Sequence, residues 1–313
     1  MGSMMNNFER GVVTMLKKIL GNTGLEISAL SFGGMEIRRL EDEGACRILN
    51  AALDGGINYI DTSPEYTFSE EQIGRAISHR RGEFVLATKC GDTMDKSNPY
   101  SYDEKTLLKN LEESLLRMNT DYIDVWQLHA LLPEMLPGGD CDEAISCMQR
   151  AVNEGKVRFL GASMRNGQMN QERYPDMFTY DTMNTVMHWK NLDVFQVVYG
   201  AMTRSSERRL HKAASLGKGI IARGAIKRYK EGYDLSWEKA GLEELFEQGE
   251  SKADFLVRYS ISHKGIASSV IGTASPEHLL MNIKAAEKGP LSAEVYAEAQ
   301  RRLEGAGFSV LAE

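Results

Sequence analysis

Eight short apolar runs alternate with helix-like segments along most of this chain, and this alternation limits the folds that it can adopt. The runs are apolar throughout rather than at every second position, which is typical of strands that are covered on both faces. Strand–helix alternation indicates a parallel sheet, and eight units within about 260 residues favour a closed barrel over an open doubly wound sheet. We therefore predict an α/β fold, a (β/α)8 TIM barrel, with strands near 29–34, 57–61, 84–88, 122–128, 158–162, 194–199, 219–222 and 268–271.

The two ends of the chain lie outside this repeat. Residues 16–20 and 25–28 flank the sequence Gly21-Asn22-Thr23-Gly24, which predicts an N-terminal β-hairpin that caps the bottom of the barrel. A helical pattern near 292–304 predicts a C-terminal tail that packs outside the barrel. Residues 1–3 resemble the remnant of an expression tag. We assign 1–13 to a tag remnant and flexible N-terminus, and 14–313 to a single barrel domain.

Composition excludes several classes of function. The net charge is −7 and no long basic block occurs, so we expect no nucleic acid partner. No run of eighteen or more apolar residues occurs, so we expect no membrane span, and the N-terminus lacks a signal-peptide pattern. The four cysteines form no C-x-x-C pair and the six histidines are scattered, so we expect no metal site. These features predict a cytoplasmic protein with reduced thiols.

Three polar residues close consecutive apolar runs. Asp61 ends the second run, Lys89 the third and His129 the fourth, while Tyr66 lies in the loop just after the second. Because adjacent strands lie about 4.8 Å apart, these side chains meet at one rim of the barrel, where chemistry is usually placed in this fold. A charge at the end of an apolar strand is unfavourable unless it is paired, so we predict a buried Asp61–Lys89 ion pair.

These four residue types suit the protonation of a carbonyl oxygen. A phenol titrates near pH 10, and an adjacent ammonium group lowers that pKa, so Lys89 would make Tyr66 a better general acid. Asp61 would hold Lys89 in place, and His129 would orient the same oxygen. The alternative is that Asp61 and Lys89 form only a structural ion pair, Tyr66 is a loop aromatic and His129 a hydrogen-bonded core residue.

The chain resembles the aldo-keto reductase family over nearly its whole length, and the family's Asp, Tyr, Lys and His tetrad falls on Asp61, Tyr66, Lys89 and His129. The resemblance implies NAD(P)H-dependent reduction of an aldehyde or ketone to an alcohol, with a tyrosine acid and no metal. The matching segments are 20–25 with 32–34, 56–63 with Tyr66 and 69–70, 87–89, 121–124 with 127–129, 155–158 with 161–163, and 270–273.

A nicotinamide cofactor needs a site for its phosphates. The chain has no G-x-G-x-x-G after its first strand, so a Rossmann site is not indicated. A barrel holds phosphates with its last loops and a helix N-terminus, and residues 272–278 offer small residues followed by Ser275, which can cap a helix starting at Pro276. The alternative is an ordinary capped helix.

The resemblance also implies contacts to the cofactor, which is NADP in most members, with NAD as the alternative. Two departures concern this site: Met164 stands where many members have an Asn that binds the carboxamide, and His278 where many NADP-specific members have Arg. By this resemblance Ser163 and Gln196 hold the carboxamide, Gly34 and Met35 line the nicotinamide end, Arg223 lies against the ring, and Gly272, Thr273, Ser275, His278 and Asn282 form the adenosine-phosphate site.

The loops after Lys89 and His129 are expected to wall a substrate pocket. They are rich in apolar residues and offer no dedicated anion clamp, which favours a neutral small-molecule carbonyl or alcohol substrate. A second hypothesis is a cofactor-binding regulatory or redox-sensing subunit with little turnover, and a third is another barrel chemistry such as isomerisation. The expected pocket residues are Met94, Pro99, Tyr100, Tyr102, Leu131, Leu132, Met135, Leu136, Pro137 and Trp189.

Overall fold

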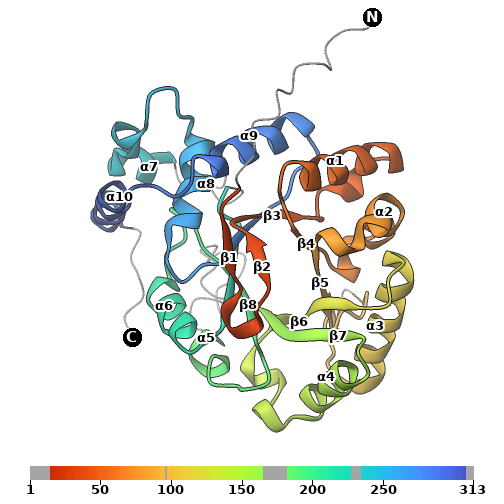
Figure 1. Cartoon of the computed structure of the whole chain (residues 1–313). Helices are drawn as coiled ribbons and strands as arrows, with labels where there is room; N and C mark the ends of the chain where they lie inside the picture. The colour runs from red at the N-terminus through yellow and green to blue at the C-terminus, as the bar shows by residue number, and fades with distance from the viewer. Residues whose placement is uncertain (1–14, 96, 165–181, 227–233, 308–313) are drawn as a thin grey trace, which may run out of the picture.

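Eight parallel strands close into a barrel in the computed structural model, which describes residues 15–95, 97–164, 182–226 and 234–307 (Figure 1). The order around the barrel is β10-β3-β4-β5-β6-β7-β8-β9, so each strand pairs with its sequence neighbours and the last pairs with the first. The predicted TIM barrel is confirmed. The strands are β3 (Leu30–Gly33), β4 (Tyr59–Asp61), β5 (Val85–Cys90), β6 (Ile123–Leu131), β7 (Val157–Met164), β8 (Val194–Val198), β9 (Gly219–Arg223) and β10 (Ser268–Ile271).

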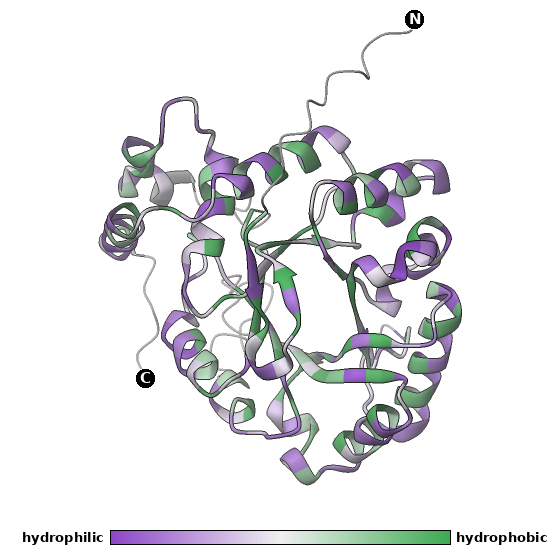
Figure 2. Ribbon diagram, in the orientation of Figure 1, coloured by the Kyte–Doolittle hydropathy of each residue, from purple (hydrophilic) through white to green (hydrophobic). Residues whose placement is uncertain are grey.

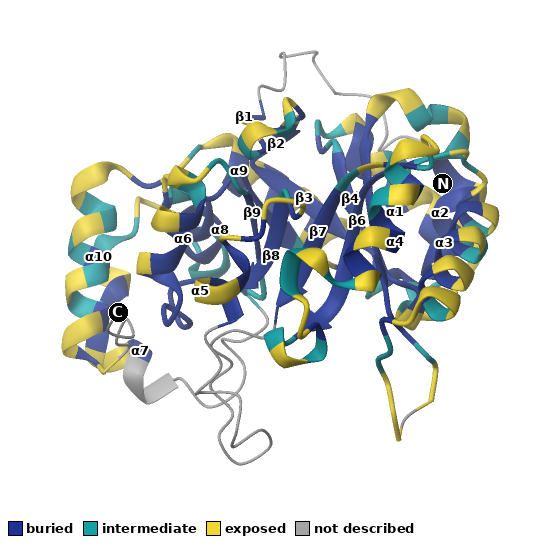
Figure 3. Ribbon diagram, turned by 90° about the horizontal axis from the view of Figure 1, so that it is seen from below, coloured by how far each residue is buried: buried dark blue, intermediate teal, exposed yellow. Residues whose placement is uncertain are grey.

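Helices form a ring around the strands, with their apolar faces turned inward and their polar faces outward (Figures 2 and 3). Several begin at a side chain that caps the first turn. Asp103 accepts from the Thr106 N–H, and Ser251 with Asp254 forms a capping box. The helices are α1 (Asp42–Asp54), α2 (Ser69–Ile77), α3 (Glu104–Met118), α4 (Glu143–Asn153), α5 (Thr182–Val186), α6 (Glu207–Ser215), α7 (Asp234–Ala240), α8 (Lys252–Ser262), α9 (Pro276–Glu287) and α10 (Ala293–Gly305).

Two helices differ from expectation. The helix predicted at 181–190 is only Thr182–Val186, and the connection before α8 contains α7, which we did not predict. An element of one or two turns presents too few apolar positions to establish a period of 3.6 residues. Among the described residues, none of the helices combines the length and apolar character needed to cross a membrane. The expected tag remnant at 1–13 lies outside the described residues.

The N-terminal hairpin closes the bottom of the barrel, as predicted. Strands β1 (Lys17–Ile19) and β2 (Glu26–Ser28) pair antiparallel across the mouth (Figure 1). Leu20, Leu25 and Ile27 pack against barrel residues in a separate apolar cluster. The Asn22 N–H donates to the Gly217 carbonyl just before β9 at 2.8 Å, so the hairpin is joined to the barrel through its backbone.

Two of the strands that carry site residues end later than expected. Lys89 is followed by Cys90 in β5, and His129 is followed by two more residues in β6. The register of β6 with β7 shifts between His129 and Leu131, and the residue between them, Ala130, has a φ of 57°. This irregularity marks a bulge, a feature that re-aims side chains at barrel rims.

The hairpin turn requires glycine at position 21, because the backbone of Gly219 lies close to it. Gly21 has a φ of 53°, and a Cβ there would lie 2.3 Å from the Gly219 nitrogen, whereas Gly24 has a φ of 72° with nothing within 4 Å. We predict that Gly21→Ala lowers the free energy of unfolding by about 3 kcal/mol and Gly24→Ala by only about 1 kcal/mol, because only the first adds a backbone clash to the strained φ. Urea unfolding of both variants measures this; equal losses would contradict it.

His263 at the end of α8 makes stability depend on acidity. Burial lowers its pKa to about 4, and its Nδ1 accepts the Gly265 N–H at 3.1 Å, which requires the neutral ring. In the unfolded chain the ring takes up a proton near pH 6.5, so between pH 6.5 and pH 4 the unfolded state binds more protons and acid favours unfolding.

We predict that His263→Asn, which retains an acceptor for Gly265, removes this dependence. The wild type should lose about 3 kcal/mol more unfolding free energy than the variant between pH 7 and pH 4. Urea unfolding at both pH values measures the difference. The exposed His79 provides the control, since His79→Asn should leave the wild-type loss unchanged. A His263→Asn variant with the full wild-type loss would exclude this residue as the cause.

Candidate active site

A buried ion pair joins β4 and β5 at the upper rim of the barrel. Lys89 Nζ donates to Asp61 Oδ2 at 2.8 Å and to the Thr62 carbonyl at 2.7 Å. Asp61 Oδ1 accepts from the side-chain amides of Gln127 at 3.2 Å and Gln196 at 2.8 Å. The predicted ion pair is therefore present, and both oxygens of its carboxylate are hydrogen-bonded.

Lys89 stays charged in spite of its burial. Burial alone lowers the pKa of a lysine, but the carboxylate of Asp61, together with Tyr66, more than offsets this, and the pKa of Lys89 lies above its ordinary value. Its side chain is almost inaccessible. The rim thus holds a fixed positive charge that a small change in pH does not remove.

Tyr66 lies against this charge. It ends a short 3₁₀ turn, η3 (Pro64–Tyr66), whose first residue follows the capping hydroxyl of Ser63. Lys89 Nζ lies 5.1 Å from the centre of the phenol ring, and the His129 ring meets it edge to face at a centroid distance of 6.3 Å. Three of the predicted residues, from β4–η3, β5 and β6, therefore converge with Asp61 at one rim.

The pKa of Tyr66 corrects one expectation. We expected Lys89 to bring it below the ordinary value of 10. Burial raises the pKa of Tyr66, and although Lys89 and Arg223 lower it, the net pKa lies above the ordinary value. The phenolate loses more solvation here than the two cations restore. Tyr66 therefore keeps its proton at neutral pH, which is the form that an acid needs.

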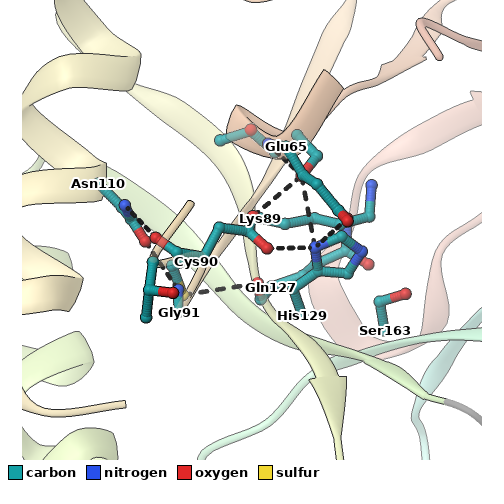
Figure 4. A network of polar contacts seen from close by, with 12 residues as sticks. Glu65, Lys89, Cys90, Gly91, Asn110, Gln127, His129 and Ser163 are labelled. Carbon is teal, nitrogen blue, oxygen red and sulfur yellow. Dashed lines mark hydrogen bonds and ion pairs between the residues drawn. The ribbon is translucent and has the colours of Figure 1, made fainter. Parts of the chain in front are cut away.

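His129 faces carboxylates rather than cations. Its Nδ1 lies 2.8 Å from Asp92 Oδ1, 3.4 Å from Ser63 Oγ and 3.6 Å from Glu65 Oε2. Figure 4 shows the Glu65 carboxylate beside the His129 ring. Asp92 is buried and its second oxygen accepts from Ser63 at 3.0 Å. In the described part of the chain, Glu65, Asp92 and His129 are the group whose ligand atoms are close enough, within 4.8 Å, to hold a metal ion. The 2.8 Å contact between His129 Nδ1 and Asp92 Oδ1 gives these two residues hydrogen-bond partners within the protein.

The expected carboxamide contacts lie on the next strands. Ser163 on β7 donates to Gln196 Oε1 on β8 at 3.1 Å, and Gln196 continues to Asp61. Arg223 ends β9 and donates to the Met164 carbonyl at 3.1 Å. The structure thus places Ser163, Gln196 and Arg223 on one arc of the rim that leads to the ion pair.

The remaining expected cofactor residues follow β3 and β10, and β10 pairs with β9, which carries Arg223. Pairing of β10 with β3 brings Gly272 beside Gly33, where a Cβ on Gly272 would lie 2.8 Å from the Gly33 carbonyl. Ser275 caps α9 by accepting the His278 N–H at 3.2 Å, as predicted. The group consists of Gly34, which is buried, Met35, half-buried, and Gly272, Thr273, Ser275, His278 and Asn282, of which Thr273 and Asn282 are buried.

The expected pocket walls divide into two sets. The Tyr100 ring meets His129 edge to face at 5.5 Å, and Met94 is exposed in the same loop. Tyr102, Leu131, Leu136 and Trp189 are instead part of the main hydrophobic core. The Tyr102 hydroxyl donates to the His129 carbonyl at 2.5 Å, so its role is to hold β6.

Three polar residues of this rim, Gln127, Glu65 and Asp92, were not expected from the sequence. Gln127 could have been found, since it lies two positions before His129 and so faces the same side of β6. Glu65 and Asp92 carry no such signal, because each lies in a loop whose path depends on tertiary packing. Asp92 is held by Asn110 of α3, which donates to its carbonyl and accepts from the Gly91 N–H.

We predict that Asp61 and Lys89 are strongly coupled in stability. Lys89→Met leaves a buried carboxylate without its cation and Asp61→Asn leaves a buried ammonium without its anion, so each should lower the unfolding free energy by about 3–5 kcal/mol. The double variant should lose less than the sum by about 1–3 kcal/mol. A urea double-mutant cycle measures this, and additive losses would show that the pair does not interact.

A comparison with known proteins agrees with the geometry. A sequence profile described as "Aldo/keto reductase family" matches residues 29–304. An uncharacterised oxidoreductase of Bacillus subtilis, YqkF, is 28% identical over 305 residues, covering 90% of this chain and 94% of its own. L-galactose dehydrogenase of Arabidopsis thaliana is 26% identical over 294 residues, covering 86% and 87%.

A solved structure has the same fold. The holo form of the aldo-keto reductase AKR11C1 from Bacillus halodurans superposes with a TM-score of 0.79 at 25% identity, covering 96% of this chain and 99% of that one. The profile match extends over most of the barrel and includes Asp61, Tyr66, Lys89 and His129. The chain therefore belongs to the aldo-keto reductase family of oxidoreductases.

Proposed function

We propose that this protein reduces an aldehyde or ketone to an alcohol with NAD(P)H, and that Tyr66 supplies the proton. The observation that carries the proposal is the position of the buried Asp61–Lys89 pair, whose ammonium lies 5.1 Å from the Tyr66 ring. A carbonyl oxygen gains negative charge as a hydride reaches its carbon, and a fixed cation beside a proton donor stabilises that charge.

The four residues would divide the work. NAD(P)H, when bound, would supply the hydride to the carbonyl carbon and would leave as NAD(P)⁺. Tyr66 gives its proton to the oxygen, and Lys89 stabilises the phenolate that remains. Asp61 keeps Lys89 charged and in place through contacts on both of its oxygens. His129, whose ring meets that of Tyr66 edge to face, would hydrogen-bond the same oxygen and orient it.

The rim residues fit a nicotinamide cofactor. Ser163 and Gln196 present a hydroxyl and an amide, which match the hydrogen-bonding groups of a carboxamide. Phosphates favour a helix N-terminus with small residues beside it, and α9 begins after Gly272, Thr273 and Ser275. Gly34 and Met35 directly follow β3, which pairs with β10 in the barrel.

We assign NADP as the preferred cofactor, with NAD as the alternative. His278 lies exposed in the first turn of α9, where a side chain can reach a 2′-phosphate. The histidine ring offers a phosphate fewer donors than the guanidinium that many NADP-specific members have at this position, so NAD is the alternative. Titration with NADPH and NADH separately measures the preference.

A neutral carbonyl compound is the substrate class that we propose. Curated relatives include an L-galactose dehydrogenase and, at 33% identity over 160 residues, a 6-dehydroglucose reductase of Novosphingobium aromaticivorans, both named for sugar-derived substrates. Glu65 and Asp92 beside His129 disfavour an anionic substrate. An aldehyde panel with and without a carboxylate tests this assignment.

Tyr66→Phe is the central test. It removes the proposed acid and leaves the ring, so kcat/KM for NADPH-dependent aldehyde reduction should fall by about 10²–10⁴-fold while the Kd for NADPH is retained. Tyr122→Phe makes the same change directly before β6, at the end of that strand away from His129, and should leave both values unchanged.

Two results would count against the proposal. Turnover that is indifferent to Tyr66→Phe would remove the mechanism. Binding of NADPH without turnover of any aldehyde or ketone in the wild type would instead favour the regulatory or redox-sensing subunit, and failure to bind either nicotinamide cofactor would favour another barrel chemistry.

A further inference from the structure

We propose that Asp92 is a positioning residue that keeps a proton on Nδ1 of His129, so that His129 meets the reacting oxygen with Nε2. This inference rests on the proposed function, because it assigns a protonation pattern to one of its residues. Neutral His129 can then only accept a hydrogen bond at Nε2, and it can donate there only as the imidazolium ion.

Oxygen atoms surround Nδ1 of His129. Oxygens of Asp92, Ser63 and Glu65 lie 2.8, 3.4 and 3.6 Å away, and two of them belong to carboxylates. Ionised carboxylates only accept hydrogen bonds. An N–H at Nδ1 satisfies this arrangement, whereas a lone pair there would face two negative groups.

Asp92 is held in place by its neighbours. Its side chain is buried, one oxygen accepts from Ser63, and its carbonyl accepts from Asn110 at 3.1 Å. An isolated buried carboxylate is unfavourable, and the imidazole N–H is a partner that it contacts. Glu65, by contrast, has a half-exposed side chain at a longer distance. Asp92 is therefore the group that sets the tautomer, and Glu65 adds negative charge from a second side.

The imidazole ring of His129 is oriented with Nδ1 towards these oxygens. In the described part of the chain, the polar contacts of the imidazole fall on Nδ1, and Tyr66 and Tyr100 meet the ring edge to face. The Tyr102 hydroxyl holds the carbonyl of His129, and the bulge at Ala130 sets the direction of the strand there. Nε2 is thus the nitrogen available to a substrate beside Tyr66.

This arrangement has opposite consequences for the two reaction directions. Reduction needs a donor towards the carbonyl oxygen, so His129 assists as the imidazolium ion at lower pH. Oxidation needs an acceptor for the alcohol proton, so His129 assists as the neutral ring at higher pH. The charged and titratable groups that face the ring are Glu65 and Tyr66 from η3, Asp92 and Tyr100 from the segment after β5, and Lys89 behind Tyr66.

Asp92→Asn tests the proposal. The amide has the same shape, and its NH₂ can donate to Nδ1, which moves the proton of neutral His129 to Nε2. For a serine hydrolase triad the equivalent change produces the wrong tautomer. We expect kcat/KM for aldehyde reduction to fall by about tenfold or more at pH 6 and less at pH 8.5, and kcat/KM for alcohol oxidation to show the reverse order.

Two further variants locate the effect. Asp95→Asn removes the same charge from an exposed position of the same loop and should leave both profiles unchanged. Glu65→Gln should change them in the same direction as Asp92→Asn but by less, because its carboxylate is farther away and half-exposed. An Asp92→Asn profile parallel to that of the wild type at every pH would overturn the proposal.

A spectroscopic measurement separates this proposal from the proposed function. Nitrogen-15 shifts of the histidine rings distinguish the Nδ1–H and Nε2–H tautomers without any turnover, and His129→Gln identifies the signal. We expect Nδ1–H in the wild type and its loss in Asp92→Asn. An Nε2–H wild-type ring would refute the positioning role even in an active enzyme. Activity abolished by EDTA and restored by Zn²⁺ would assign Glu65, Asp92 and His129 to a cation and would also refute it.

Discussion

The buried contact between Asp61 and Lys89 is the interaction on which the rest of this site depends. An ammonium can remain charged inside a barrel only when a carboxylate is fixed beside it, and Asp61 is fixed by amides from β6 and β8 as well as by Lys89. Four strands therefore contribute to one charge-paired cluster. The closure of the barrel supplies this geometry, because it brings β4, β5, β6 and β8 to a common rim.

Tyr66 and His129 have neighbours of opposite charge. Cations from β5 and β9 lower the pKa of Tyr66 against the larger effect of its burial, while two carboxylates face His129. The two residues are in ring contact, so a carbonyl oxygen that approached both would meet a phenol that keeps its proton and an imidazole whose Nδ1 faces carboxylates.

The backbone is irregular at the two residues that follow these side chains. Thr67 has a φ of 50° directly after Tyr66, and Ala130 has a φ of 57° directly after His129. Left-handed conformations of residues other than glycine are unfavourable and persist only where the surrounding structure imposes them. Here the capping hydroxyl of Ser63 and the hydroxyl of Tyr102 hold the neighbouring backbone. The barrel supplies the rigidity, and these short departures from regular structure set the directions of the Tyr66 and His129 side chains.

The sequence by itself determined the barrel, the hairpin and the pairing of Asp61 with Lys89, because apolar period and unpaired charge are local properties with few solutions. It also indicated Tyr66 and His129, since strand ends of parallel sheets share a rim. Only the tertiary structure decided that burial outweighs Lys89 in the pKa of Tyr66, and that Asp92 and Glu65 face His129. The pKa of Tyr66 depends on how far many distant residues exclude solvent, and the contacts of His129 depend on the paths of two loops. The spacing of residues in a short segment determines neither.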